Sequence, residues 1–180
     1  MSLQILSDYF LDKLNNLNDS KRYKIQPEII LYLSQVLTAN LNSNFYHGGP
    51  SEYLFDLYKK SLESSGKLER QNNFRHLGDY SLIRAGYFID QSRNKINMDY
   101  YIEMGSSAYY QVYFISSQDL FYALSKKYQD CVFILNDLAS LDRNQSHCII
   151  KIYEGWLENQ DAFTKNKLFN LGLIPREVKE

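Results

Sequence analysis

Three carboxylates and their tyrosine neighbours, in the middle of the chain, are the residues best suited to acid–base chemistry. Asp79 is followed by Tyr80. Asp99 is followed by Tyr100, and Glu103 lies four residues after Asp99. A buried carboxylate whose pKa is raised can give or take a proton beside a phenol. The sequence therefore allows a polar pocket with Asp79, Asp99 and Glu103 as its polar groups, provided that two helices bring these residues together.

Aromatic and small residues of the same segment would shape such a pocket. Tyr80, Tyr87 and Tyr101 are the expected walls. Gly86 and Gly105 carry no side chain, so they predict that the helices around residues 74–90 and 97–115 cross at short range. The space beside the two glycines would be the space for a ligand.

A purely structural interpretation accounts for the same carboxylates. Asp99 falls in the first turn of a predicted helix, where it can cap the helix, and Glu103 can point into solvent. Arg75 lies four residues before Asp79, so the two side chains can form an ion pair on one helix face. Under this interpretation there is no pocket.

Tyrosine is unusually abundant and is concentrated in the same region. The chain holds 16 tyrosines among 180 residues. Neighbouring helical residues diverge by about 100°, so Tyr100 and Tyr101 cannot face one way, and neither can Tyr109 and Tyr110. Some of these phenols must reach a second surface, and tyrosine is enriched at protein interfaces. Seven of them lie within residues 74–113: Tyr80, Tyr87, Tyr100, Tyr101, Tyr109, Tyr110 and Tyr113.

Motifs for metals and cofactors are missing. His47, His76 and His147 are the three histidines, and none has a glutamate three residues before it, as a helical di-metal site would require. His76 and Asp79 form a single i, i+3 pair, which is a weak metal signal. No glycine-rich phosphate motif occurs, so we expect neither a metal nor a cofactor. A net charge of −1 gives no reason to expect nucleic-acid binding.

The spacing of apolar residues predicts an all-α protein, because it follows a helical period almost throughout. We expect one compact domain of about seven to nine helices over residues 1–175, followed by a disordered tail at 176–180. A polar loop is expected at 18–22, and Ser117 is expected to cap the sixth helix. The predicted helices cover residues 2–17, 27–41, 51–64, 67–88, 98–112, 117–128, 131–141, 149–157 and 162–171.

The start of the chain and its two cysteines indicate a cytoplasmic protein. Asp8 interrupts the first residues before any long apolar run, so they do not form a signal peptide. No window of 18 uncharged apolar residues occurs, which argues against membrane insertion. Cys131 and Cys148 are expected to be small buried residues in a reducing compartment.

Several short strings in the second half of the chain resemble one family. The family consists of uncharacterised proteobacterial proteins with the signature LGD-x-SL…G-[FY]-F…DYYI-x-MG-x-x-AY. The resemblance covers residues 70–175 and implies a bacterial, soluble, helical protein without implying any chemistry. Arg84 and Tyr87 depart from the family pattern. The matching strings are Leu77–Leu82, Gly86–Phe88, Asp99–Ile102, Met104–Gly105, Ala108–Tyr109, Ile152–Leu157 and Leu171–Pro175.

These observations favour a non-enzymatic interaction or regulatory protein, which uses a tyrosine-rich face around residues 80–113. The expected partner is another protein or a second copy of the chain. The alternative is a small-molecule or enzymatic pocket between the helices around 74–90 and 97–115. No catalytic motif accompanies that alternative.

Overall fold

The computed structural model describes residues 2–21, 23–41, 52–88 and 98–144, together with Trp156, Lys165, Leu168 and Phe169. Its elements are α1 (Ser2–Lys21), α2 (Pro27–Leu41), α3 (Glu52–Glu63), α4 (Lys67–Gly86), α5 (Met98–Ser116), α6 (Asp119–Lys126) and α7 (Tyr128–Asn144). Over these ranges every regular element is a helix, which confirms the all-α prediction and the lower end of the predicted helix count. Among these helices, none is both long and apolar enough to cross a membrane.

The first two helices form a hairpin that is closed by one side chain. The Asn18 amide accepts a hydrogen bond from the Ile25 backbone NH at 3.0 Å and donates one to the Ile25 carbonyl at 3.1 Å. Pro27 then opens α2, where a missing backbone NH costs nothing. The predicted polar loop at 18–22 was therefore wrong for residues 18–21, because α1 continues to Lys21 and Asn18 forms these hydrogen bonds from within the helix.

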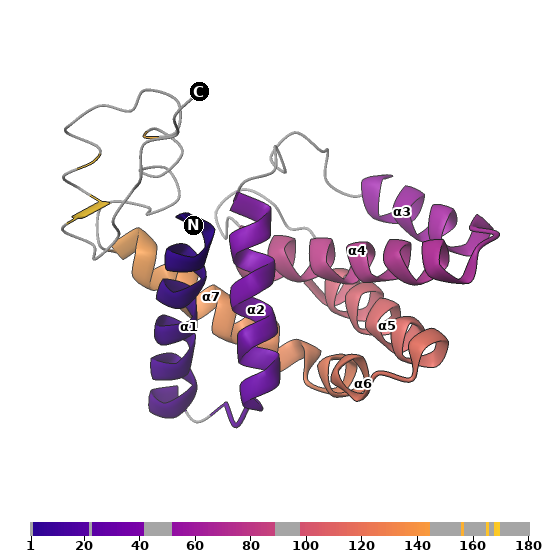
Figure 1. Ribbon diagram of the computed structural model, residues 1–180. Coiled ribbons are helices and arrows are strands. Elements are labelled where there is room, and N and C mark those ends of the chain that lie inside the picture. Colours follow the sequence, from indigo (N-terminus) through magenta and orange to yellow (C-terminus); the bar gives the residue numbers. More distant parts are fainter. Residues whose placement is uncertain are drawn as a thin grey trace.

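Helices α4 and α5 pack along each other to the right of the α1–α2 hairpin in Figure 1. Helix α3 packs on α4, and α6 packs on α5. Helix α7 crosses behind the α1–α2 hairpin in Figure 1 and also contacts α4. This arrangement lets side chains from four or five helices meet around the middle of α4.

Both ends of the sixth helix differ from the prediction. Ser117 has a φ of 58°, and Gln118 occupies the N-cap position of α6. The helix then ends at Lys126, and Tyr128 begins α7, so the predicted helix 117–128 is shorter at both ends. The helical period of residues 131–141 is confirmed, since they form the middle of α7.

The core extends through all seven described helices. It joins leucine and isoleucine side chains of α1 and α2 to aromatic side chains of α4, α5 and α7. The expected helices at 149–157 and 162–171 lie almost wholly outside the described residues, as does the expected tail at 176–180. The largest fully buried side chains are Trp156, Tyr80, Tyr109, Tyr128, Phe10 and Phe74.

Candidate functional site

Asp79 lies on the packed side of α4, within a run of buried residues. Leu77, Gly78, Tyr80 and Ser81 are all buried, and the Asp79 side chain keeps only 18% of its accessible surface. A carboxylate in such a position needs partners, because removing an unpaired charge from water is costly. The partners come from three different helices.

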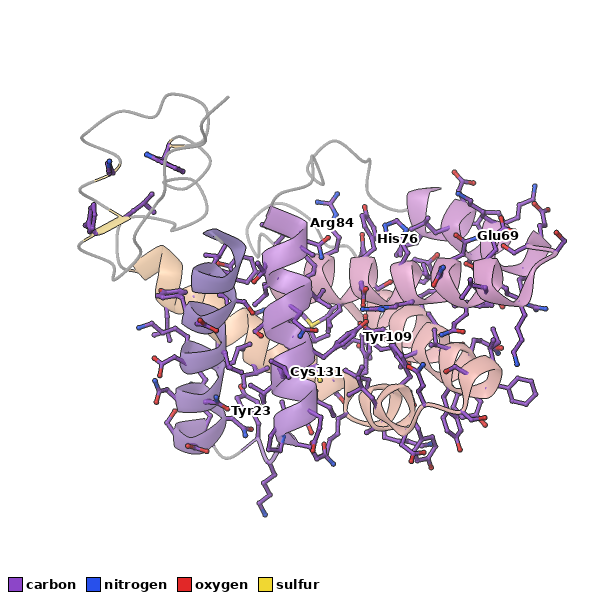
Figure 2. The ribbon with its side chains drawn as sticks, in the orientation of Figure 1. Tyr23, Glu69, His76, Arg84, Tyr109 and Cys131 are labelled. Carbon is purple, nitrogen blue, oxygen red and sulfur yellow. The ribbon has the colours of Figure 1, made fainter. Side chains whose placement is uncertain are left out.

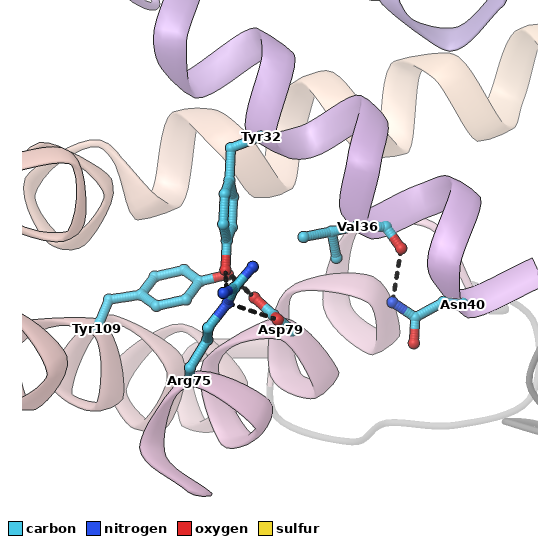
Figure 3. A network of polar contacts seen from close by, with 6 residues as sticks. All are labelled: Tyr32, Val36, Asn40, Arg75, Asp79 and Tyr109. Atoms are coloured by element: carbon cyan, nitrogen blue, oxygen red, sulfur yellow. Dashed lines mark hydrogen bonds and ion pairs between the residues drawn. The ribbon is translucent and has the colours of Figure 1, made fainter. Parts of the chain in front are cut away.

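Two phenols and one guanidinium surround the Asp79 carboxylate (Figure 3). Tyr32 of α2 and Tyr109 of α5 each donate a hydrogen bond to Asp79 Oδ1, both at 2.6 Å. Arg75 Nε lies 3.8 Å from Asp79 Oδ2 and also donates to the Tyr32 hydroxyl at 3.1 Å. The i, i+4 ion pair expected on α4 is thus present, and it is one edge of a larger network.

Aromatic rings enclose the same group of polar atoms. The rings of Tyr32 and Tyr109 meet edge to face with their centroids 6.0 Å apart, and Phe121 of α6 contacts both at 5.7 and 5.8 Å. The Arg75 guanidinium lies 5.3 Å from the centre of the Tyr32 ring. Helices α2, α4, α5 and α6 therefore converge on Asp79.

Burial dominates the electrostatics of this cluster. It raises the pKa of Asp79 to about 6, against the opposing effect of the hydrogen bonds from Tyr109 and Tyr32 and of the Arg75 charge. The pKa of Tyr109 is raised well above its ordinary value, first by burial and then by the nearby Asp79 charge. Tyr109 therefore stays protonated and remains a hydrogen-bond donor.

Gly78 makes room for the Tyr109 ring. A Cβ atom at Gly78 would lie 2.5 Å from Tyr109 Cε1, closer than two carbons can approach. Tyr128 of α7 donates a hydrogen bond to the Gly78 carbonyl at 3.1 Å. The missing side chain at Gly78 thus allows the Tyr109 ring to approach α4 closely and its hydroxyl to reach Asp79. Figure 2 shows Tyr109 in the centre of the molecule, with Arg84 and Glu69 toward opposite ends of α4.

The glycines singled out in the sequence face a different helix from the one expected. A Cβ at Gly86 would meet Leu135, and one at Gly105 would meet the Tyr128 hydroxyl. Both neighbours belong to α7. The close packing of α4 and α5 is present, but these two glycines accommodate α7 side chains, so they do not leave space for a ligand between α4 and α5.

The predicted pocket walls are buried in the core. Tyr80, Tyr87 and Tyr101 each expose 4% or less of their surface. Arg84 Nε donates to the Tyr80 hydroxyl at 3.2 Å. Burial, followed by the neighbouring Tyr80, raises the pKa of Tyr101. All three tyrosines belong to the hydrophobic core.

The remaining predicted site residues lie toward the surface of α5. Asp99 and Glu103 are exposed, and Tyr100 is half-buried with its ring 6.2 Å from that of Tyr101. The hydrogen bonds and the ion pair of Asp79 come from other residues. Of the seven predicted site residues, Asp79 alone belongs to the carboxylate network.

Sequence reasoning missed Tyr32, which supplies half of the hydrogen bonding to Asp79. A usable signal was present, because Tyr32 lies three residues after Ile29 and so belongs to the buried stripe of α2. A tyrosine on a buried stripe requires a partner for its hydroxyl. The identity of that partner, 47 residues away, was not visible in the sequence.

A second aromatic group is exposed, on α5 and α6. Phe114 exposes 76% of its surface, Tyr110 45% and Tyr122 43%, while Tyr113 is half-buried between the tyrosines. The ring of Tyr113 lies 6.3 Å from that of Tyr110 and 5.1 Å from that of Tyr122. We call Tyr110, Tyr113, Phe114 and Tyr122 the aromatic patch.

Neither group of residues resembles a metal site. Within the described ranges no three histidine, cysteine or acidic side chains come close enough together to hold a metal ion. Comparisons of the chain with protein-family models, with curated proteins and with solved structures found no match. The resemblance to the proteobacterial family therefore stays a prediction.

Proposed function

We propose that this protein is a non-enzymatic interaction module that binds another protein through the aromatic patch of α5 and α6. The observation that carries the proposal is the pair of ring contacts that joins Tyr110, Tyr113 and Tyr122 over two adjacent helices, with Phe114 exposed next to Tyr113 in the chain. Single exposed apolar residues are common on proteins, but contiguous aromatic side chains are characteristic of binding surfaces.

The proposed binding face differs from the one expected from the sequence, because only the end of the tyrosine-rich segment 80–113 contributes to the aromatic patch. Tyr80, Tyr87 and Tyr101 are buried and cannot touch a partner unless the core opens. Tyr110 and Tyr113 lie at the end of the same segment and are accessible. The excess of tyrosine therefore has two uses, namely a core with hydrogen-bonded phenols and a surface with exposed rings.

A ligand pocket around Asp79 is the alternative. The filled hydrogen bonds of Asp79 Oδ1 weigh against it, because Tyr32 and Tyr109 already occupy the oxygen that a substrate would need. A thermal-shift screen over metabolites and divalent metals tests this alternative, since a ligand at 100 times its Kd stabilises a protein by about 2.7 kcal/mol. We expect that no compound raises the melting temperature of the wild type without also raising that of the variant Asp79→Asn.

Affinity capture tests the proposed function. The wild-type protein and the variant Phe114→Ser/Tyr122→Ser would be immobilised and exposed to a lysate of the source organism. Phe55→Ser is the matched control, because Phe55 is 61% exposed on α3, away from the patch. We expect the patch variant to lose proteins that both the wild type and the control retain. Identical sets of captured proteins for all three would contradict the proposal.

A further inference from the structure

We propose that the aromatic patch binds a second copy of this chain, with the two α6 helices antiparallel about a two-fold axis at Tyr122. This inference rests on the proposed function, because it assigns a partner to the same surface. Closed two-fold dimers are the commonest protein assemblies, and each copy then presents the same surface to the other. The case for a second copy comes from how charges are placed around Tyr122.

Three exposed residues form one stripe along α6. Asp119, Tyr122 and Lys126 are spaced i, i+3 and i+7, which places them on one helix face, and all three are exposed. Asp119 and Lys126 are about 10.5 Å apart along the helix axis at 1.5 Å per residue. Tyr122 lies within half a residue of their midpoint. A two-fold axis through the midpoint therefore brings Tyr122 close to the partner's Tyr122.

The charges of this stripe complement themselves in only one orientation. In an antiparallel pair, Asp119 faces the partner's Lys126 and Lys126 faces the partner's Asp119. A parallel pair would instead oppose like charges. In the part of the chain that the structure describes, neither Asp119 nor Lys126 forms an ion pair, whereas Lys127 and Asp130 pair with each other at 2.9 Å. The Lys126 ammonium lies 5.4 Å from the centre of the Tyr122 ring of its own helix, so Lys126 is placed beside the proposed axis.

The neighbouring rings of α5 widen the contact. The Tyr113 ring lies 5.1 Å from that of Tyr122, Tyr110 lies about one turn before Tyr113 on α5, and Phe114 directly follows Tyr113. With roughly 200 Å² per aromatic side chain, the exposed rings offer on the order of 300 Å² of apolar surface per copy. A standard interface buries about 800 Å² per partner, so this surface predicts a weak dimer with a Kd of about 10 μM to 1 mM.

Sedimentation equilibrium tests the arrangement with two charge variants. The protein concentration would range up to about 1 mM, the weak end of the expected Kd. Asp119→Lys gives the stripe two positive charges, and Lys126→Asp gives it two negative charges. We expect each variant alone to dimerise about tenfold more weakly than the wild type, because two attractive pairs become repulsive. We expect an equimolar mixture to regain wild-type association, because the two lysines of one variant then face the two aspartates of the other.

Asp119→Lys places a cation at the N-terminus of α6 and Lys126→Asp places an anion at its C-terminus, and both interact unfavourably with the helix dipole. A third variant is therefore needed in case these changes disturb α6. Tyr122→Arg brings two cations together at the axis and should leave the protein monomeric, with Phe55→Arg on α3 as the control that still dimerises. Circular dichroism would establish that each variant is folded.

Several results would overturn the inference. The first is a wild type that stays monomeric at every concentration. The second is a mixture of the two charge variants that associates no more strongly than either variant alone. The third is a Tyr122→Arg variant that dimerises as strongly as the wild type. A monomeric wild type whose patch variant still loses captured proteins would refute the second copy as partner and leave the proposed function standing. Unchanged capture together with a dimer that depends on Tyr122 would restrict the patch to self-association.

Discussion

Tyr109 crosses from α5 to α4 above the Cα atom of Gly78 and donates a 2.6 Å hydrogen bond to Asp79. The bond ties the two central helices together at a residue that Tyr32 also joins to α2. Because the acceptor is a buried carboxylate, the cluster stabilises the protein only while its hydrogen bonds are complete. Its strength depends on side-chain identity, on close packing and on pH.

Removal of the carboxylate should destabilise the fold. Asp79→Ala leaves the hydroxyls of Tyr32 and Tyr109 without their acceptor, and an unsatisfied buried donor costs about 1–3 kcal/mol. Asp79→Asn keeps an oxygen acceptor and should lie within about 1 kcal/mol of the wild type at pH 7. Urea unfolding measures the free energy, with the exposed Glu103→Ala as control. A loss for Glu103→Ala as large as that for Asp79→Ala would mean that Asp79 has no special structural role.

The free energy of unfolding should respond to pH through Asp79. Its pKa rises from 3.8 to about 6 on folding, so the folded state binds the proton more tightly than the unfolded chain does. The contribution of Asp79 is therefore most favourable below pH 4 and is lost as pH rises through 6. Relative to Asp79→Asn, the wild type should gain about 2 kcal/mol between pH 7 and pH 4.

Other carboxylates titrate in the same interval, so the difference between the two proteins is the quantity to measure. Urea unfolding at several pH values gives this difference directly. A difference that stays constant between pH 7 and pH 4 would show that Asp79 titrates at its ordinary value in the folded protein.

Sequence patterns predicted the seven described helices, apart from some of their ends, but not the contacts between them. The period of the apolar residues correctly indicated the helical middle of α7, and the spacing of Arg75 and Asp79 correctly indicated their ion pair. Both patterns are local, since each depends on residues that lie within one or two turns of the same helix. The hydrogen bond from Tyr32 to Asp79 spans 47 residues and depends on how α2 lies against α4. No single-helix pattern contains that information.

The same limit explains the errors at the glycines and in the tyrosine-rich segment. Gly86 and Gly105 indicated close packing correctly, but only the fold shows that α7 supplies the neighbouring side chains. Adjacent tyrosines correctly implied two different surfaces. Which tyrosine of each pair is buried, Tyr109 rather than Tyr110, depends on the position of α4 relative to α5.

A methyl group at Gly78 should disrupt the contact between α4 and Tyr109. Gly78→Ala places a Cβ 2.5 Å from a ring carbon, so the ring or the helix must move and the hydrogen bond to Asp79 is strained. We expect a loss of about 1–3 kcal/mol, despite the higher helix propensity of alanine. Gly66→Ala is the control, because its Cβ would only reach ordinary contact with Glu69 at 3.7 Å. Equal stabilities of the two variants would show that the Tyr109 ring does not lie against Gly78.

The thiol of Cys131 should react only when the protein unfolds. Its side chain is fully buried on α7, and burial, followed by the charge of Asp130, raises its pKa, so little of the reactive thiolate forms. The variant Cys148→Ala leaves Cys131 as the single cysteine of the chain. We expect a disulfide reagent to label this variant slowly in buffer and completely in urea, with a midpoint that coincides with unfolding followed by circular dichroism. Rapid labelling of the folded variant would mean that α7 separates from the core without global unfolding.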